Sequence, residues 1–339
     1  MTLSLVGYIG FDGRFIGGIK ELPLIGNEAF ILTDQKIHCI HNLKKDNSSL
    51  YISIAKTDIE EVPVDLPIDG IFNSHIAIFG NTGSGKSNTL ASLYQGLFNV
   101  SNNNDAFQQN CKFLFLDFNG EYTKTDCITQ NKKIYNLQTQ NDTGNKIPVS
   151  SDELFDDETL SVLVEATDKT QKPFLKRALR FYKNAKTKSD FASYLKTIVQ
   201  YKIIDILRMT NKEVAFKLLD YAEEVLDKFI IDEEARNLRI GIDFNNTNKE
   251  FTYNGTYLNT NPLSIKETNF YKAANSIDDA KISSIPELSQ FYIFLHLQLI
   301  EDLFRYKVQN DHIYPVINRF KSKQTSIERT VMPPIKSSI

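Results

Sequence analysis

The chain has 339 residues, of which 41% are hydrophobic and 24% charged, values that exclude an intrinsically disordered or fibrous protein. The 39 Lys and Arg residues against 42 Asp and Glu give a net charge of -3, which excludes a uniformly basic protein that coats nucleic acid. DNA binding in a local groove or ring lumen stays open. At roughly 100–200 residues per domain, the length predicts two or three domains.

The cysteines and the hydropathy of the sequence indicate where in the cell the protein is expected. Cys39, Cys111 and Cys127 share no C-x-x-C spacing, which argues against a disulfide framework or a zinc site and favours a reducing compartment. The longest apolar stretch, residues 291–300, is interrupted by polar side chains and is too short to span a membrane. We therefore expect a cytoplasmic protein without a membrane partner.

The first 70 residues are expected to form a small antiparallel β-barrel. Short apolar runs are separated by glycine-containing turns, a pattern typical of short strands. The predicted strands are residues 3–9, 29–33, 37–40 and 50–54.

Residues 71–148 show a strand, a glycine-rich turn, a helix and a second strand, the order of a βαβ unit with a parallel sheet. The strands are expected at residues 75–79 and 113–116. The apolar side chains of the intervening helix recur on one face: Leu90, Leu93, Tyr94, Leu97 and Phe98. The fold class predicted here is α/β.

Residues 149–242 are expected to form a helical bundle inserted into this core, one of whose helices is capped by Asn211. Residues 243–339 are expected to contain a polar loop region and then a long helix ending near residue 308. Ser284 and Glu287 have the spacing of a capping box that would open this helix.

The turn after the first core strand matches the phosphate-binding pattern G-x-x-x-x-G-K-[ST] in full. Glycines let successive backbone N–H groups point at phosphate oxygens, Lys86 would contact the β- and γ-phosphates, and the Ser87 hydroxyl would bind Mg²⁺. The spacing alone does not distinguish ATP from GTP. The predicted nucleotide-binding residues are Gly80, Asn81, Thr82, Gly83, Ser84, Gly85, Lys86, Ser87 and Asn88.

A second acidic motif, Asp117-Phe-Asn-Gly-Glu-Tyr122, follows the second core strand. Ligands of open α/β sheets bind at the carboxyl ends of strands, so Asp117 is expected to hold Mg²⁺ through water and Glu121 to polarise the attacking water. In the alternative interpretation, Asp117 only caps a turn in which Gly120 supplies a positive φ.

These motifs together resemble the HerA family of DNA-translocating ATPases, in the FtsK–HerA branch of RecA-like motors. The resemblance rests on His75 before the P-loop, the loop itself, and the D-F-N-G-E-Y motif. It implies an N-terminal β-barrel, a RecA-like P-loop core and an inserted helical bundle. It also implies ATP and Mg²⁺ as cofactors, a hexameric ring around duplex DNA, and a nuclease or defence effector as partner.

The sequence departs from the family pattern at three places. Asn119 replaces the usual His, Ser74 stands where many members have Arg, and no Walker B strand ending in Asp-Glu follows the bundle. Residues 229–233 imitate that motif but continue a helical register. Two strands are secure, with residues 133–137 a third candidate, whereas a RecA-like core has about five. The core is therefore expected to be incomplete, either as an N-terminal portion of a longer motor or as a reduced family member.

Two functions follow from these observations. The first is an ATP-driven, ring-forming DNA translocase or helicase. The second is a nucleotide-gated assembly or regulatory scaffold that hydrolyses little ATP, which the missing Walker B strand favours. A group of basic residues is either a contact for DNA phosphates or a solvated face: Arg319, Lys321, Lys323 and Arg329.

Overall fold

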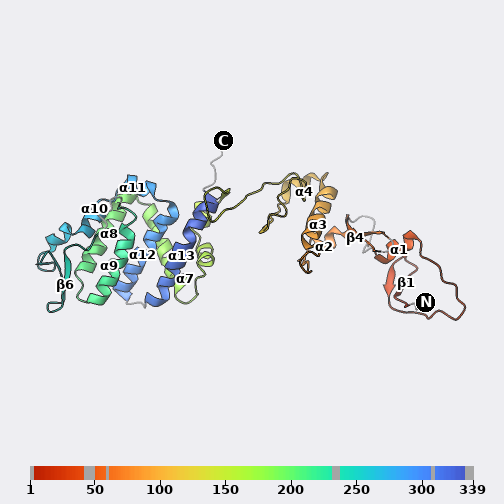
Figure 1. Cartoon of the computed structure of the whole chain (residues 1–339), viewed down its shortest axis with the longest axis horizontal. Helices are drawn as coiled ribbons and strands as arrows, with labels where there is room; N and C mark the ends of the chain where they lie inside the picture. The colour runs from red at the N-terminus through yellow and green to blue at the C-terminus, as the bar shows by residue number, and fades with distance from the viewer. Residues whose placement is uncertain (1–3, 42–49, 59–60, 231–236, 307–309, 333–339) are drawn as a thin grey trace. The chain divides into compact units, whose positions relative to one another are not determined.

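The computed structural model describes residues 4–41, 50–58, 61–230, 237–306 and 310–332 (Figure 1). The chain divides into two compact units, residues 1–134 and residues 135–339. No helix in the described ranges has the length and apolarity to cross a membrane.

The first unit combines short strands with one long helix. Its elements are β1 (Gly7–Ile9), β2 (Phe15–Gly17), α1 (Asp34–His41), β3 (Tyr51–Lys56), β4 (Pro63–Pro67), α2 (Ile68–Ile71), α3 (Lys86–Ser101) and α4 (Asp105–Asn110). Strands β1 and β2 form one antiparallel pair, and β3 and β4 form another. Because the described strands form two separate two-stranded sheets, the predicted barrel is not confirmed.

One predicted strand of this unit is wrong, because residues 37–40 belong to helix α1. The backbone N–H groups of Lys36 and Ile37 donate to the Thr33 carbonyl, which starts the helix. Ile37 is buried, and Ile40 lies three residues further along. This spacing places both on one helical face, whereas in a strand the two side chains would point to opposite faces.

No β-ladder includes any of the predicted core strands, residues 75–79, 113–116 and 133–137, within the described chain. Residues 113–116 nevertheless alternate as a strand does. The rings of Phe113 and Phe115 lie 6.0 and 4.9 Å from that of Tyr94 on α3. Leu114 and Leu116 are 86% and 76% exposed. The segment therefore covers α3 with one face, and its other face is open.

The second unit is mainly helical. Its elements are β5 (Ile147–Pro148), α5 (Ser151–Leu154), α6 (Asp157–Leu163), α7 (Gln171–Lys186), α8 (Phe191–Leu207), α9 (Lys212–Leu226), β6 (Ile242–Asn245), β7 (Glu250–Tyr253), β8 (Thr256–Tyr257), the 3₁₀ helix η2 (Pro262–Glu267), α10 (Asn269–Asn275), α11 (Asp279–Ser284), α12 (Glu287–Tyr306), α13 (Asn310–Thr330) and β9 (Val331–Met332). Asn211 caps α9 as predicted, accepting from the Val214 N–H at 3.2 Å.

Helix α12 is the centre of this unit and packs against α7, α9 and α13. All residues from 288 to 300 are buried, including the predicted polar interruptions His296 and Gln298. The long helix was predicted correctly, but Ser284 does not cap it. Ser284 instead ends α11, and its hydroxyl donates to the Lys281 carbonyl at 2.7 Å.

The region predicted as a polar loop contains regular structure. Strands β6, β7 and β8 form a three-stranded antiparallel sheet, and helices α10 and α11 follow it. Phe251 of β7 is fully buried and lies against the Phe244 ring at 5.1 Å. Asn245 ends β6, and its side-chain oxygen accepts from the backbone N–H groups of Thr247 and Asn248 in the turn that leads to β7. The polar composition of this region therefore reflects tight turns between short strands and not a long loop.

The two ends of the helical unit are joined by a clasp, defined here as the β5–β9 pair and the contacts beside it. Strands β5 and β9 are parallel and pair Ile147 with Val331. The Lys146 ammonium donates to the Glu328 carbonyl at 2.6 Å. The clasp thus holds together two segments that are separated by more than 180 residues in the sequence.

Candidate nucleotide-binding site

The predicted phosphate-binding loop lies directly before helix α3. Gly83 and Gly85 have φ values of 81° and 87°, a backbone conformation that side-chain-bearing residues rarely adopt. A Cβ atom at Gly80 would collide with the Ser84 hydroxyl. A side chain at Gly80 would require the Ser84 side chain to move, and the positive φ of Gly85 turns the chain into the helix at Lys86.

Lys86 closes the loop from the helix side. Its ammonium donates to the carbonyls of Gly80 and Asn81 at 2.9 and 2.8 Å, so the charge lies over the loop itself. Ser87 is half-buried in the first turn of α3, and Asn88 beside it is exposed. All the predicted nucleotide-binding residues therefore belong to one continuous loop and the first helical turn.

This loop fits a phosphate group by its chemistry. The N-terminus of the 16-residue helix α3 has unpaired N–H groups and the positive end of the helix dipole. The Lys86 ammonium places a positive charge at the loop, and the Ser87 hydroxyl is a suitable Mg²⁺ ligand once a nucleotide supplies phosphate oxygens. Within the described ranges, no cluster of three or more His, Cys, Asp or Glu residues suits a metal ion.

Helix α3 is held in the first unit by its apolar face. Leu93 and Leu97 are buried, as the sequence predicted, and Ile52 of β3 lies against the helix at Gly96. A Cβ atom added to Gly96 would come within 3.2 Å of the Ile52 side chain. The glycine therefore allows the strand to approach the helix that carries the phosphate-binding loop.

The acidic motif forms a compact turn around its own aspartate. Asp117 accepts from the backbone N–H groups of Asn119, Gly120 and Glu121 through Oδ1, at 3.2, 2.9 and 3.1 Å, and from Tyr122 through Oδ2 at 2.8 Å. The Tyr122 N–H contributes most to a pKa of Asp117 that is lower than usual. The turn predicted as the alternative interpretation is therefore present.

The turn does not test the predicted metal role of Asp117. A carboxylate has about four acceptor sites, and Oδ2 accepts only one N–H, so it retains a site for a metal-bound water. Gly120 has a φ of 73°, as the turn requires. Glu121 and His75 are exposed. The catalytic assignment of Asp117 and Glu121 stays a prediction.

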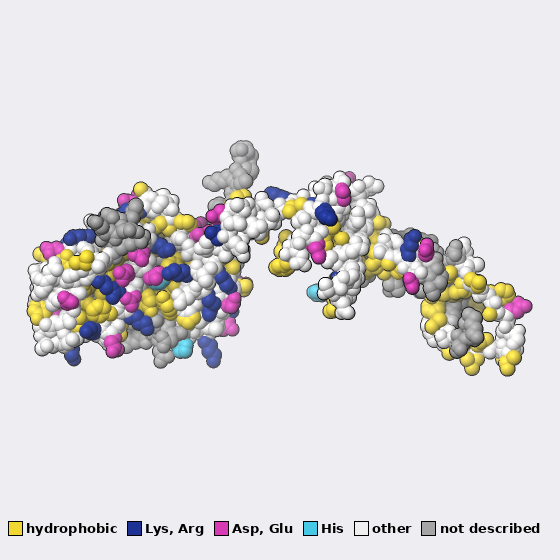
Figure 2. Space-filling view, viewed as in Figure 1, with side chains coloured by type: hydrophobic (Ala, Val, Ile, Leu, Met, Phe, Trp, Pro, Cys, Tyr) yellow, Lys and Arg dark blue, Asp and Glu magenta, His cyan; other side chains and the backbone are white. Residues whose placement is uncertain are grey.

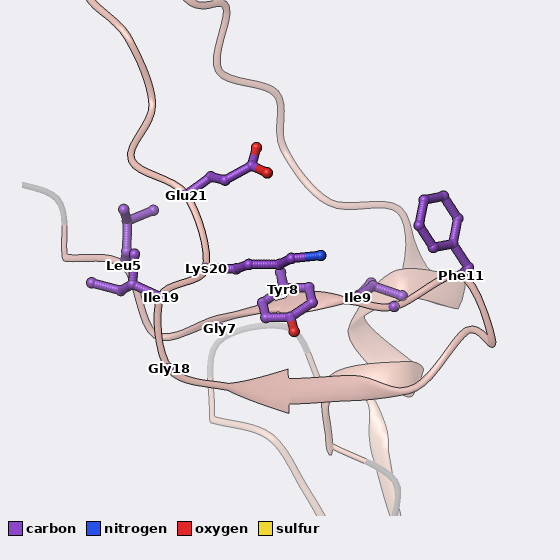
Figure 3. Close-up of a pocket in the computed structure, with 10 residues that line it drawn as sticks. Leu5, Gly7, Tyr8, Ile9, Phe11, Gly18, Ile19, Lys20 and Glu21 are labelled. Atoms are coloured by element: carbon purple, nitrogen blue, oxygen red, sulfur yellow. The ribbon is translucent and has the colours of Figure 1, made fainter.

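A pocket at the N-terminal hairpin lies away from this motif in sequence. It is lined by Leu5, Tyr8, Ile9, Phe11, Ile19, Lys20 and Glu21, and Figure 3 shows Lys20 alongside Tyr8. The Lys20 ammonium is 6.0 Å from the centre of the Tyr8 ring. Its lining has none of the residues predicted to bind nucleotide.

The basic residues predicted near the C-terminus are all engaged within the protein. Lys321 pairs with Glu224 at 3.1 Å and Lys323 with Glu165 at 2.7 Å. Arg329 pairs with Asp142 and donates to the carbonyls of Thr139 and Gln140. Arg319 donates to the Val164 carbonyl at 2.6 Å and to Gln171 at 2.7 Å. These contacts favour the interpretation as a structural face over one as a DNA-binding patch.

Arg319 is expected to contribute to stability because its guanidinium joins α13 to the end of α6 and the start of α7. Arg319→Ala should lower the free energy of unfolding by about 2 kcal/mol, the typical size for hydrogen bonds to a charged group. Lys323→Ala removes only an exposed ion pair and should change it by less than about 0.5 kcal/mol. Urea unfolding followed by circular dichroism measures both, and equal effects would contradict this assignment.

Comparison with known proteins identifies the sequence class of the chain. The profile of the family described as "Helicase HerA, central domain" matches residues 52–314, more than three quarters of the chain. A protein named "Probable helicase" from Methanocaldococcus jannaschii is 26% identical over 143 residues. That alignment covers 41% of this chain and 25% of the archaeal protein, so the chain aligns with a quarter of that relative's length.

No solved structure matches the chain. The family match includes His75, the phosphate-binding loop and the Asp117 turn, on which the resemblance rests, and also most of the helical unit. The chain is a member of the HerA helicase family and contains its central domain.

Proposed function

We propose that this chain is the ATP-binding part of a HerA-type DNA translocase, in which ATP hydrolysis is coupled to movement of DNA. The observation that carries the proposal is the loop at residues 80–85, with its two left-handed glycines and the Lys86 ammonium placed over it at the head of α3. The family membership supports a helicase-like ATPase.

Each of the predicted site residues would have a defined role in nucleotide binding or hydrolysis. The backbone N–H groups of residues 83–86 and Lys86 would hold the β- and γ-phosphates, and Ser87 would hold Mg²⁺. The metal would neutralise phosphate charge and orient the γ-phosphate for attack. Asp117 would hold Mg²⁺ through a water molecule, and Glu121 would orient the attacking water.

Assembly and partners belong to the same proposal. We propose a hexameric ring with duplex DNA in its lumen, as the family resemblance implies, with a nuclease or defence effector as partner. The open face of residues 113–116, where Leu114 and Leu116 are exposed, supports assembly with further protein that would cover these side chains. Figure 2 shows many hydrophobic side chains at the surface of the first unit.

A second candidate is the nucleotide-gated scaffold with little hydrolysis. It is favoured by one observation: among the described residues after the bundle, no strand ends in a pair of acidic residues. The Asp232 and Glu233 pair that imitates this motif lies outside the described residues.

The two candidates differ in ATP turnover. We expect the translocase to hydrolyse ATP at a rate that rises severalfold when duplex DNA is added. Phosphate release with and without DNA, run beside analytical ultracentrifugation with ATP, measures turnover and assembly together. ATP-dependent assembly without turnover would contradict the translocase and support the scaffold, and absence of ATP binding would contradict both.

A further inference from the structure

The loop after the acidic motif is held by a lysine that belongs to no recognised motif. The Lys132 ammonium donates to the backbone carbonyls of Tyr122, Lys124 and Cys127, at 2.7, 2.5 and 2.7 Å. Three carbonyls match the three N–H bonds that an ammonium can donate. Lys132 is half-buried, although most of the residues around it are exposed.

The Asp117 turn and the Lys132 contacts meet at one residue. Tyr122 gives its N–H to Asp117 Oδ2 at 2.8 Å and its carbonyl to Lys132 Nζ at 2.7 Å. The Asp117 carboxylate therefore accepts from the N–H groups of residues 119–122. The Lys132 ammonium donates to the carbonyls of Tyr122, Lys124 and Cys127. Both sides of the Tyr122 peptide units are bonded to charged groups, which form stronger hydrogen bonds than neutral ones.

Glu121 directly precedes Tyr122, the residue that both Asp117 and Lys132 contact. The backbone N–H of Glu121 donates to Asp117, while its side chain is exposed. A carboxylate that orients a water molecule needs a fixed backbone, because small displacements of a catalytic group cost large factors in rate. Thr123 adds a further bond within the turn, from its hydroxyl to the Gly120 carbonyl at 2.9 Å.

We propose that Lys132 is a positioning residue for ATP hydrolysis: together with the Asp117 carboxylate it fixes the loop that presents Glu121, without touching the nucleotide. This inference rests on the proposed function, in which Glu121 orients the attacking water. The two lysines therefore have different roles: Lys86 contributes to nucleotide binding, and Lys132 contributes to the chemical step.

The inference is tested in the full chain with two measurements. Hydrogen exchange of the amides of residues 119–127 reports on the loop itself, and steady-state ATP hydrolysis gives kcat and KM. The variant is Lys132→Met, which keeps the length of the side chain and removes its charge. Lys132→Arg is the conservative variant, and Lys124→Met is the matched control because it removes an exposed ammonium from the same loop.

In Lys132→Met we expect the loop amides to exchange roughly tenfold faster, and kcat to fall roughly tenfold with KM for ATP within about twofold. Lys132→Arg should restore most of both, and Lys124→Met should match the unmodified chain. Unchanged exchange in Lys132→Met, a rise in KM that accounts for the lost rate, or no recovery with arginine would overturn the inference.

Failure of the proposed function has a different signature. An unmodified chain that does not bind ATP contradicts the proposed function, while the exchange of residues 119–127 still decides whether Lys132 fixes the loop. An unmodified chain that binds ATP without hydrolysing it overturns the role of Lys132 in the chemical step.

Discussion

Lys86→Met should weaken ATP binding by roughly 10- to 100-fold. The ammonium is the only side-chain cation that the described structure places on the phosphate-binding loop, where it donates to the carbonyls of Gly80 and Asn81. A hydrogen bond to a charged group contributes about 1.5–3 kcal/mol, which corresponds to this range of affinity. Titration with a fluorescent ATP analogue measures the dissociation constant directly.

Lys112→Met is the matched control for this prediction. Lys112 is an exposed lysine of the same unit that lies outside the loop, so its replacement should leave the affinity within about twofold. Since Lys86 also holds its own loop, the thermal unfolding of both variants should be compared. Equal affinities for the unmodified chain and Lys86→Met would show that the loop does not bind nucleotide phosphates.

The second large effect is a loss of stability in mild acid that is caused by His296. The imidazole is fully buried in α12, its Nδ1 lies 3.2 Å from the Tyr292 carbonyl, and its Nε2 has no hydrogen-bond partner within the described chain. Burial lowers the pKa of His296 from 6.5 to about 4, an effect that the Tyr292 carbonyl and Glu224 partly oppose.

The direction of the pH effect follows from proton binding. Between pH 6.5 and 4 the unfolded chain binds a proton at His296 and the folded chain does not, so acid favours unfolding. The contribution is constant above pH 6.5 and should reach a loss of about 3 kcal/mol near pH 4. His296→Leu should remove this part of the slope.

Urea unfolding at pH 7, 6, 5 and 4, followed by circular dichroism, measures this difference. The comparison of variant with unmodified chain removes the contribution of carboxylates, which titrate in both. His312→Gln, at an exposed position of α13, is the control and should keep the slope of the unmodified chain. Parallel stability curves for His296→Leu and the unmodified chain would show that His296 does not titrate as proposed.

The parts of the site that were predictable from sequence depend on local chemistry. The phosphate-binding loop needs glycine at defined positions, and α3 has an apolar face that reads directly as a helix. The core strands were harder to predict from sequence. The side chains of residues 113–116 alternate as in a strand, but the sequence does not show whether a neighbouring strand pairs with them. Residues 37–40 were predicted as a strand but belong to helix α1, because two isoleucines three residues apart share a helical face.

Lys132 and Arg319 were not predicted to have these roles because most of their partners are backbone carbonyls. Lys132 contacts residues up to ten positions away, and Arg319 contacts residues about 155 positions away. A carbonyl is present at every residue, so the sequence has no pattern that identifies the one to be contacted. The basic group that includes Arg319 was recognised by composition, but only the fold shows that its charges are already paired.

The clasp between β5 and β9 brings the two described ends of the helical unit together. Ile147 and Val331 are paired neighbours although the helices of the unit lie between them in the sequence. Removal of the intervening helices would therefore leave a gap between Pro148 and Val331 that a short turn can bridge.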